Sequence, residues 1–209
     1  MPDLSLYLWA IILPVTHPPI ENLQDIAFIW DMDGTLLDTY EAHYQIWKEA
    51  LHGSAPCFNR EVFTRNFGRT NEESVPKYFG YPLPEVDARE LIDRKEALFV
   101  QRLADLVTPF EGVTNWLAYL HQAGCKMAIA SSAPMNNLVP MVDIFGLRPY
   151  FQHILSGVGM PSKPAPDVFL AAADLLGVSP ATAVVFEDSL AGLRGAQAAG
   201  MLRVAKAGH

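Results

Sequence analysis

The stretch FIWDMDGTLLD, residues 28–38, is the most informative part of this chain. The apolar residues 26–30 predict a buried strand, and the Gly-Thr pair behind the second acid predicts a turn. Asp31 and Asp33 would therefore leave the carboxyl end of a strand together and enter a loop. The structural alternative is an ordinary surface turn that contains two acidic residues.

Two aspartates one residue apart are costly neighbours. Like charges a few ångströms apart raise the pKa of at least one carboxyl unless a cation lies between them. A hard divalent cation such as Mg²⁺ meets that need. One carboxylate could then stay ionised as nucleophile and metal ligand, while the other carries a proton to and from a leaving group.

The composition is that of a folded, acidic chain. Its 209 residues are 50% hydrophobic, with a mean hydropathy of +0.13, and suit one large domain or one domain with an insert. The net charge of −8 and the pI near 5.1 argue against nucleic acid as a partner, which would need a clustered basic face. Small anionic substrates remain compatible, provided that local cations outweigh the global charge.

The two cysteines and the N-terminal segment carry less information. Cys57 and Cys125 match no metal-ligand spacing, so we expect two buried, reduced thiols in a cytoplasmic protein. The apolar segment 4–15 is shorter than the roughly 20 residues that span a membrane, and no Lys or Arg precedes Lys48, unlike in a secretory signal. An edge strand, a short packed segment and an upstream-start artefact all stay open for residues 1–24, whose role is unassigned.

Residues 39–108 are predicted to form an all-helical block. Asp38-Thr-Tyr-Glu41 has the form of a capping box, so we interpret Asp38 as a helix N-cap rather than as a catalytic group. Gly53-Ser-Ala-Pro56 ends the first helix. Further helical patterns cover residues 60–67, 71–79 and 84 to about 106.

From residue 112 onward, helical and strand patterns alternate. Helices are predicted at 112–123, 136–145, 166–176 and 188–199, and strands at 126–130, 153–156, 183–186 and 202–205. This alternation implies a Rossmann-like, doubly wound parallel sheet, with ligands outside the carboxyl ends of its strands. The helical block, inserted after the first strand, would lie over that edge as a lid.

Two further motifs come from a strand end and a stiff loop. Ser131, with Ser132 behind it, could bind a phosphate oxygen through its hydroxyl and the next backbone N–H, although an ordinary ST turn is the structural alternative. Lys163 is followed by two prolines that fix the backbone, so its ammonium could neutralise charge near a phosphate. The alternative for Lys163 is a solvated loop lysine.

A last motif, Glu187-Asp188-Ser189, repeats the acidic pattern after another apolar strand. Together with Asp31 and Asp33, these acids supply oxygen ligands for one Mg²⁺. Asp188 or Ser189 could also cap the next helix. The order Asp-x-Asp, Ser, Lys, Glu-Asp, with three of the four motifs directly after strands, points to one shared site more firmly than any motif alone.

This set of motifs resembles the haloacid dehalogenase-like superfamily, from Ile26 almost to the C-terminus. Within it, the chain is similar to the β-phosphoglucomutase and phosphoglycolate-phosphatase branch. The similarity rests on Asp38-Thr39-x-x-x-His43-x-x-x-Trp47-Lys48, Lys163-Pro-Ala-Pro-Asp-x-Phe169 and Glu187-Asp-Ser-x-Ala-Gly192. The resemblance implies an α/β catalytic core at residues 25–38 and 109–209, and a helical cap at residues 39–108.

The resemblance also implies a double displacement on a phosphate ester. Asp31 would attack phosphorus and form an aspartyl-phosphate, while Asp33 protonates the leaving oxygen and then activates water. Mg²⁺ would be held by Asp31, the Asp33 backbone carbonyl and Asp188, with Glu187 as a further ligand or as support. Ser131 and Lys163 complete the catalytic set that the resemblance implies.

The cap is expected to select the substrate. Arg69 and Asn71 fall in the segment 67–72, where relatives place a substrate-specificity loop, and Lys95 falls where mutases carry a cap lysine. Ser132 and His43 complete the predicted substrate-binding residues. The alternatives are a helix-capping loop for the segment, a solvated helix face for Lys95 and a place in the cap core for His43.

Two departures argue against a mutase. Mutases carry an arginine where this chain has Asn71, and Lys-Asn where it has Pro134-Met135. A mutase must hold a bisphosphate in two orientations, so it needs cations for the distal phosphate, whereas a phosphatase does not.

The chain also stops at His209, where relatives usually continue for another strand and helix, so we expect a less stable sheet edge with the chemistry intact.

The sequence therefore predicts a Mg²⁺-dependent phosphatase of a small phosphorylated metabolite, such as a sugar phosphate. We expect a cytoplasmic monomer or weak dimer with no nucleic-acid or membrane partner. β-Phosphoglucomutase is the alternative enzyme, and a non-catalytic binding protein with the same fold is the alternative from another class.

Overall fold

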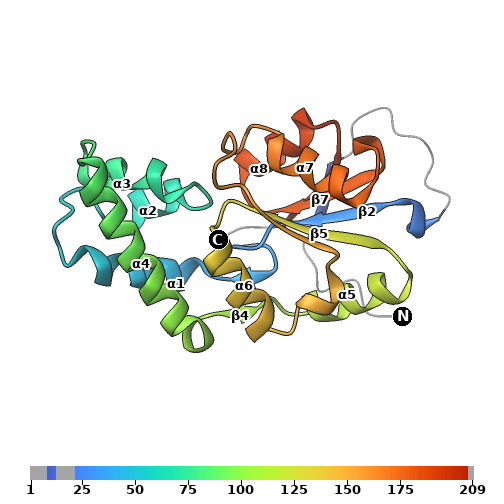
Figure 1. The fold of residues 1–209 in the computed structure, drawn as a ribbon, viewed down its shortest axis with the longest axis horizontal. Coiled ribbons are helices and arrows are strands. Elements are labelled where there is room, and N and C mark those ends of the chain that lie inside the picture. Colours follow the sequence, from blue (N-terminus) through green and yellow to red (C-terminus); the bar gives the residue numbers. More distant parts are fainter. Residues whose placement is uncertain (1–8, 13–21, 207–209) are drawn as a thin grey trace.

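A twisted sheet with helices on both faces lies beside a separate group of helices (Figure 1). The computed structural model describes residues 9–12 and 22–206. Its main sheet has six strands in the order β1-β8-β7-β2-β5-β6. They are β1 (Trp9–Ile12), β2 (Ala27–Trp30), β5 (Lys126–Ser131), β6 (His153–Ser156), β7 (Ala183–Glu187) and β8 (Leu202–Lys206).

The direction of these strands confirms the predicted doubly wound parallel core. β1 runs antiparallel to β8, and every other neighbouring pair in the sheet is parallel. The helices of this core are α5 (Val113–Gln122), α6 (Met135–Ile144), α7 (Asp167–Leu176) and α8 (Leu190–Ala198), with 3-10 turns at Leu23–Asp25, Arg148–Tyr150 and Pro180–Thr182. Parallel strands need such crossover helices, which cover the sheet from both sides.

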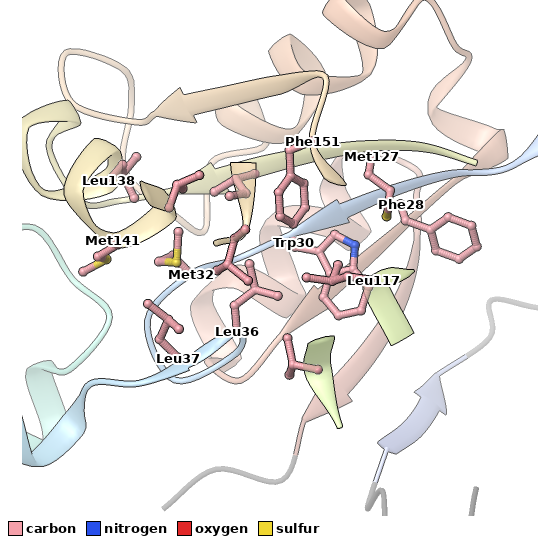
Figure 2. Close-up of a cluster of buried hydrophobic side chains, with 14 of the residues drawn as sticks. Phe28, Trp30, Met32, Leu36, Leu37, Leu117, Met127, Leu138, Met141 and Phe151 are labelled. Carbon is pink, nitrogen blue, oxygen red and sulfur yellow. The ribbon is translucent and has the colours of Figure 1, made fainter. Parts of the chain in front are cut away.

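The central strand β2 is buried on both faces, and its alternating side chains divide the core in two. Ala27 and Ile29 pack with side chains of α7 and α8. Phe28 and Trp30 pack on the opposite face with side chains of α5 and α6 (Figure 2). The ring of Trp30 also stacks on Phe186 of the neighbouring strand, with 3.9 Å between centroids. The strand that delivers the acidic pair is thus held by packing on both faces of the sheet.

The separate helices form the predicted helical block and have an aromatic core of their own. They are α1 (Tyr40–Leu51), α2 (Arg60–Asn66), α3 (Asn71–Phe79) and α4 (Glu85–Leu106). Trp47 of α1, Phe63 of α2 and Tyr78 of α3 are almost fully buried in this core. α1 packs along α4, and α3 contacts both α2 and α4.

A short two-stranded ladder that the sequence did not predict joins this block to the sheet. It consists of β3 (Leu37–Asp38) and β4 (Thr108–Pro109), in which Asp38 pairs with Thr108. The prediction that Asp38 is the N-cap of the first helix is therefore wrong. Because the ladder holds Asp38 in a strand, helix α1 begins one residue later, with Thr39 at the N-cap position.

The structure also tests the expectations for the N-terminal segment and for the two cysteines. Residues Trp9–Ile12 form β1 beside β8, in agreement with the edge-strand alternative, whereas the rest of the segment 4–15 lies outside the described residues. The expectation that both cysteines are buried is wrong for Cys57, which is exposed in the turn between α1 and α2, while Cys125 is buried. Within residues 9–12 and 22–206, no helix combines the length and the apolar character that crossing a membrane requires.

The packing of α5 against the sheet yields a test of the core. Leu117 is fully buried in α5, whereas Leu175 of α7 is 51% exposed. We expect Leu117→Ala to lower the free energy of unfolding by about 2–5 kcal/mol, because it removes buried apolar contacts and leaves a cavity. Urea denaturation measures this loss, with Leu175→Ala as the matched control. Equal losses in the two variants would contradict the packing described here.

Candidate active site

Acidic side chains converge at the carboxyl ends of β2 and β7. The Asp31 N–H donates to the carbonyl of Phe186 at 3.0 Å, so the ladder between these strands ends where the acids begin. One carboxylate oxygen from each of Asp31, Glu187 and Asp188 lies within 4.8 Å of the others. Asp31 and Glu187 are buried. An ordinary acidic surface turn does not describe this arrangement.

A single lysine holds two of these acids. The Lys163 ammonium donates to Asp31 Oδ1 and to Glu187 Oε1, at 2.6 Å each. Burial opposes the charge of Lys163, but the two carboxylates outweigh this effect and raise its pKa. Lys163 is buried, so the alternative of a solvated loop lysine is wrong.

Two carboxyls of the cluster resist ionisation in spite of the nearby Lys163. Burial raises the pKa of Asp31 well above its usual value, against the opposing effect of Lys163. Burial and the nearby Glu187 also raise the pKa of Asp188, to about 7. Carboxyls that resist ionisation in this way are those that a further cation would stabilise. The oxygen-only donor set suits a hard cation such as Mg²⁺.

The hydrogen bonds separate the acids that could bind a metal from those that support them. Glu187 Oε1 accepts from Lys163, and Oε2 accepts from the backbone N–H and the hydroxyl of Ser189, so its carboxylate is fully engaged. Asp31 accepts a hydrogen bond from Lys163 through Oδ1, and among residues 22–206 no side chain donates one to its Oδ2 or to the Asp188 carboxylate. The Asp33 side chain lies outside this cluster. Asp31 and Asp188 are therefore the side chains best placed to hold the ion.

Gly34 is required at the turn between the two aspartates and the ladder. Its φ of +79° lies in the left-handed region, and its N–H donates to the carbonyl of Leu37 at 2.9 Å. A Cβ at this position would lie 2.1 Å from Asp188 Oδ2. Any larger residue would displace a predicted metal ligand.

Asp33 points instead toward the helical block. His43 of α1 is 3.0 Å from Asp33, measured from Nε2 to Oδ1, and its ring stacks on Phe99 of α4 at 4.2 Å. Burial and then Lys95 lower the pKa of His43, so the neutral ring donates its Nε2–H to the carboxylate. Burial opposes the ionisation of Asp33, but His43, Thr39 and Lys95 together outweigh it and lower the pKa of Asp33. His43 was predicted to bind substrate; it lines the pocket and also contacts this acid.

The predicted serine motif forms the turn that was its structural alternative, and it also faces the site. Ser131 Oγ accepts a hydrogen bond from the backbone N–H of Ala133 at 3.0 Å, as in an ST turn. Ser131 and Ser132 both line the pocket above Asp31. Ser189 caps α8 by accepting from the Gly192 N–H at 3.0 Å, while Asp188 precedes the cap.

One pocket joins the acidic cluster to the helical block. It encloses about 650 Å³ of space between atoms, part of it open to solvent. The predicted cap residues Arg69, Asn71 and Lys95 all line it. Lys95 is buried, so the alternative of a solvated helix face is wrong. The Arg69 side chain is 51% exposed and lies 3.8 Å from Glu73.

Glu96 of α4 and Asn137 of α6 are among the polar residues of this pocket that sequence reasoning missed. Both are buried, and the Asn137 amide donates to the Glu96 carboxylate. The available signal was a charge inside an apolar helical stripe, because Glu96 lies in register with Ile92, Phe99 and Leu103. A polar residue at such a position needs a partner, which the sequence alone does not identify.

Comparison with known proteins agrees with this geometry. A family model described as haloacid dehalogenase-like hydrolase matches residues 27–200. The chain belongs to this family. The predicted resemblance and the prediction of a hydrolase of this superfamily are thereby confirmed.

The relatives of the chain include sugar-phosphate enzymes. β-Phosphoglucomutase of Bacillus subtilis is 31% identical over 187 residues, which cover 85% of this chain and 81% of the relative. Fructose-1-phosphate phosphatase of Escherichia coli is 29% identical over 84% of this chain and 93% of its own length. The structure of CbbY from Rhodobacter sphaeroides in complex with phosphate has a TM-score of 0.75 and 27% identity, and the match covers 85% of this chain and 84% of that one.

The raised pKa of Asp188 yields a pH-dependent prediction. Its pKa of about 7 lies above its usual value of 3.8, so the folded protein without metal holds a proton that the unfolded chain releases, and its stability falls as the pH rises through this interval. Metal binding needs the ionised form, and so it gains over the same interval. We expect Mg²⁺ to raise the Tm more at pH 8 than at pH 6, as measured by thermal unfolding.

Asp188→Asn is the control for this measurement, since the amide cannot supply a charged ligand. We expect it to remove most of the Mg²⁺-dependent shift in Tm at pH 8. A shift of equal size at both pH values, or one that persists in Asp188→Asn, would contradict the assignment of Asp188 as a ligand.

Proposed function

We propose that this chain is a Mg²⁺-dependent phosphomonoesterase that acts on a sugar phosphate or a similar small metabolite through an aspartyl-phosphate. One observation carries the proposal: the Asp31 carboxylate lies beside a pocket, is held by Lys163 at 2.6 Å and is close to Asp188. A carboxylate held by hydrogen bonds and poised for attack is the form that nucleophilic catalysis requires.

The reaction proceeds in two steps on the residues of this site. In the first, an Asp31 oxygen attacks phosphorus, the ester P–O bond breaks, and Asp33 gives a proton to the leaving oxygen. In the second, Asp33 takes a proton from water, which attacks the same phosphorus and releases inorganic phosphate and the Asp31 carboxylate. Asp31, Asp188 and the Asp33 backbone carbonyl would hold Mg²⁺, which would supply positive charge for the phosphoryl oxygens.

The state of Asp33 matches the second step more directly than the first. Its lowered pKa favours the ionised form, which is the base that water activation needs. The first step needs the protonated form. A phosphate group that enters the pocket raises the pKa of a nearby carboxyl by like-charge repulsion, and so it favours proton uptake by Asp33. His43 holds the acid in place through both steps.

The remaining groups of the site bind and select the substrate in this proposal. The Ser131 hydroxyl and the Ser132 N–H bind a phosphate oxygen, while Lys163 keeps Asp31 and Glu187 in place. Arg69, Asn71 and Lys95 contact the rest of the molecule from the helical block, residues 39–108, which acts as a cap over residues 25–38 and 109–209. We also propose a monomer or weak dimer in the cytoplasm.

The relatives support a sugar phosphate as the substrate, and they are compatible with two reactions, hydrolysis and a mutase reaction. The named phosphatases include the fructose-1-phosphate enzyme and a phosphorylated carbohydrates phosphatase of Thermotoga maritima, which is 28% identical. The similarity to a β-phosphoglucomutase favours a mutase as the second candidate. Asn71 and Pro134 lack the cationic groups that a mutase uses for a distal phosphate, so we favour hydrolysis.

The nucleophile is tested by replacing Asp31. We expect the native protein to release inorganic phosphate from a panel of sugar phosphates and phosphoglycolate with Mg²⁺ and not with EDTA. Asp31→Asn lowers release below detection in this proposal, because the amide is not a nucleophile. Release that persists in this variant would overturn the mechanism.

Two other results of the same panel would favour the alternatives. Interconversion of β-glucose 1- and 6-phosphates with a bisphosphate activator, without accumulation of phosphate, would establish the mutase. No turnover in either assay, together with a biological activity that Asp31→Asn leaves unchanged, would favour a non-catalytic binding protein with the same fold.

The acid role of Asp33 has its own test. We expect Asp33→Asn to slow the hydrolysis of a sugar phosphate by about 100-fold or more, as is typical for the loss of a general acid-base group. The loss of burst-phase rate with p-nitrophenyl phosphate should be much smaller, since its leaving group departs without a proton. If Asp33→Asn reduced the rate of the first step equally for the sugar phosphate and for p-nitrophenyl phosphate, Asp33 would not be the group that protonates the leaving oxygen.

A further inference from the structure

A buried ion pair lies in the roof of the pocket. Lys95 and Glu96, adjacent on α4, are only 2% and 4% exposed, and the Lys95 ammonium donates to Glu96 Oε1 at 3.0 Å. The same ammonium lies 5.5 Å from the ring centroid of Trp47 and 5.2 Å from that of Phe99. Neighbours in a helix do not ordinarily face each other, so a contact of this kind depends on the surrounding groups.

Glu96 is bound from three helices at once. Its Oε1 also accepts from the Asn71 amide of α3 at 2.5 Å, and its Oε2 accepts from the Asn137 amide of α6. Burial opposes the ionisation of Glu96, but Lys95 and Asn137 outweigh it and lower the pKa of the carboxyl. The charged Glu96 carboxylate is therefore fixed in place between the helical block and helix α6, which packs on the sheet.

This arrangement determines how much positive charge the pocket can offer a ligand. Among residues 22–206, the arginine and lysine side chains that line the pocket are Arg69 and Lys95. Arg69 is half exposed and lies 3.8 Å from Glu73. A phosphate that approached Lys95 would also approach the Glu96 carboxylate, and like charges at such distances repel strongly where water is excluded.

The same region is well suited to neutral hydroxyls. Asn71, Ser74 and Asn137 line the pocket and offer amide and hydroxyl groups. The Asn137 Oδ1 atom is buried and accepts no hydrogen bond within the part of the chain that the structure describes. Asn137 is itself only 1% exposed. A buried acceptor of this kind is stabilised by a donor such as a ligand hydroxyl.

We propose that Glu96 determines the substrate class: by neutralising Lys95 it admits phosphomonoesters whose other groups are neutral hydroxyls, and it excludes esters with a second phosphate. The proposal rests on the proposed function. The attacked phosphate lies at Asp31, and the polyhydroxylated remainder extends toward Asn137 and Asn71. The hydrogen-bond partners of Glu96 are Lys95, Asn71 and Asn137 and not Asp31 or Asp33, so in this proposal its effect falls on selectivity.

Binding to a catalytically silent protein tests this proposal most directly. In the Asp31→Asn background with Mg²⁺, calorimetry compares fructose 1-phosphate with fructose 1,6-bisphosphate, a pair that differs by one phosphate. Glu96→Gln keeps the shape of the side chain and removes its charge. We expect it to shift the affinity ratio toward the bisphosphate by about tenfold or more, because the repulsive group is gone while Lys95 remains.

Matched variants separate this effect from a general disturbance of the pocket. Glu90→Gln makes the same chemical change at an exposed position of α4 and should leave the ratio unchanged. Lys95→Met added to Glu96→Gln should abolish the gain in bisphosphate affinity. Asn137→Asp added to Glu96→Gln returns a carboxylate to the network from the α6 side and should restore the preference for the monophosphate. Thermal unfolding verifies that each variant is folded.

The outcomes distinguish the two levels of the proposal. If both esters bind and Glu96→Gln leaves their ratio unchanged, or if the gain persists without Lys95, the role of Glu96 is overturned while the phosphatase assignment stands. If neither ester binds to any form of the protein, both the role of Glu96 and the assignment to sugar phosphates fail.

Discussion

The buried ammonium of Lys163 is the contact on which the architecture of the site depends. It joins the acid that follows β2 to the acid that ends β7, at 2.6 Å each. Without it, two carboxylates would face each other in a region closed to water, and leaving such charges without a partner costs about 3–5 kcal/mol. The parallel order of the sheet makes this contact possible, because it brings the carboxyl ends of both strands to one edge. A loop from beyond β6 then reaches across that edge with the lysine.

The features that could be predicted from sequence are those that depend on residues close together in the chain. Apolar runs such as residues 126–130 and 183–186 became strands with boundaries shifted by one residue at most. The acids and the serine followed these strands as expected, since a parallel sheet collects the ends of its strands. The doubly wound core and its helical insert were therefore predictable, together with the cluster of Asp31, Glu187 and Asp188.

What could not be predicted depends on pairing between distant segments. Asp38 satisfies the local pattern of a helix cap, yet pairing with Thr108 places it in a strand, and no local signal reports that partner. Glu96 and Asn137 lie 41 positions apart, and their hydrogen bond exists only because α4 rests on α6. Cys57 shows the opposite case: an apolar-leaning residue stays exposed because the turn that carries it lies at the surface of the helical block.

The short ladder of Asp38 and Thr108 has a further consequence for the chain as a whole. The helical block leaves the sheet domain and returns to it at residues that are paired across one rung, so its two ends are adjacent in space. The distance between the two ends of such an insert is fixed by the ladder and does not depend on the number of residues in the insert. The free energy of closing the loop rises only slowly as residues are added. The helical block could therefore be exchanged for another insert whose termini are adjacent. The active site at the edge of the sheet would then be covered by different residues.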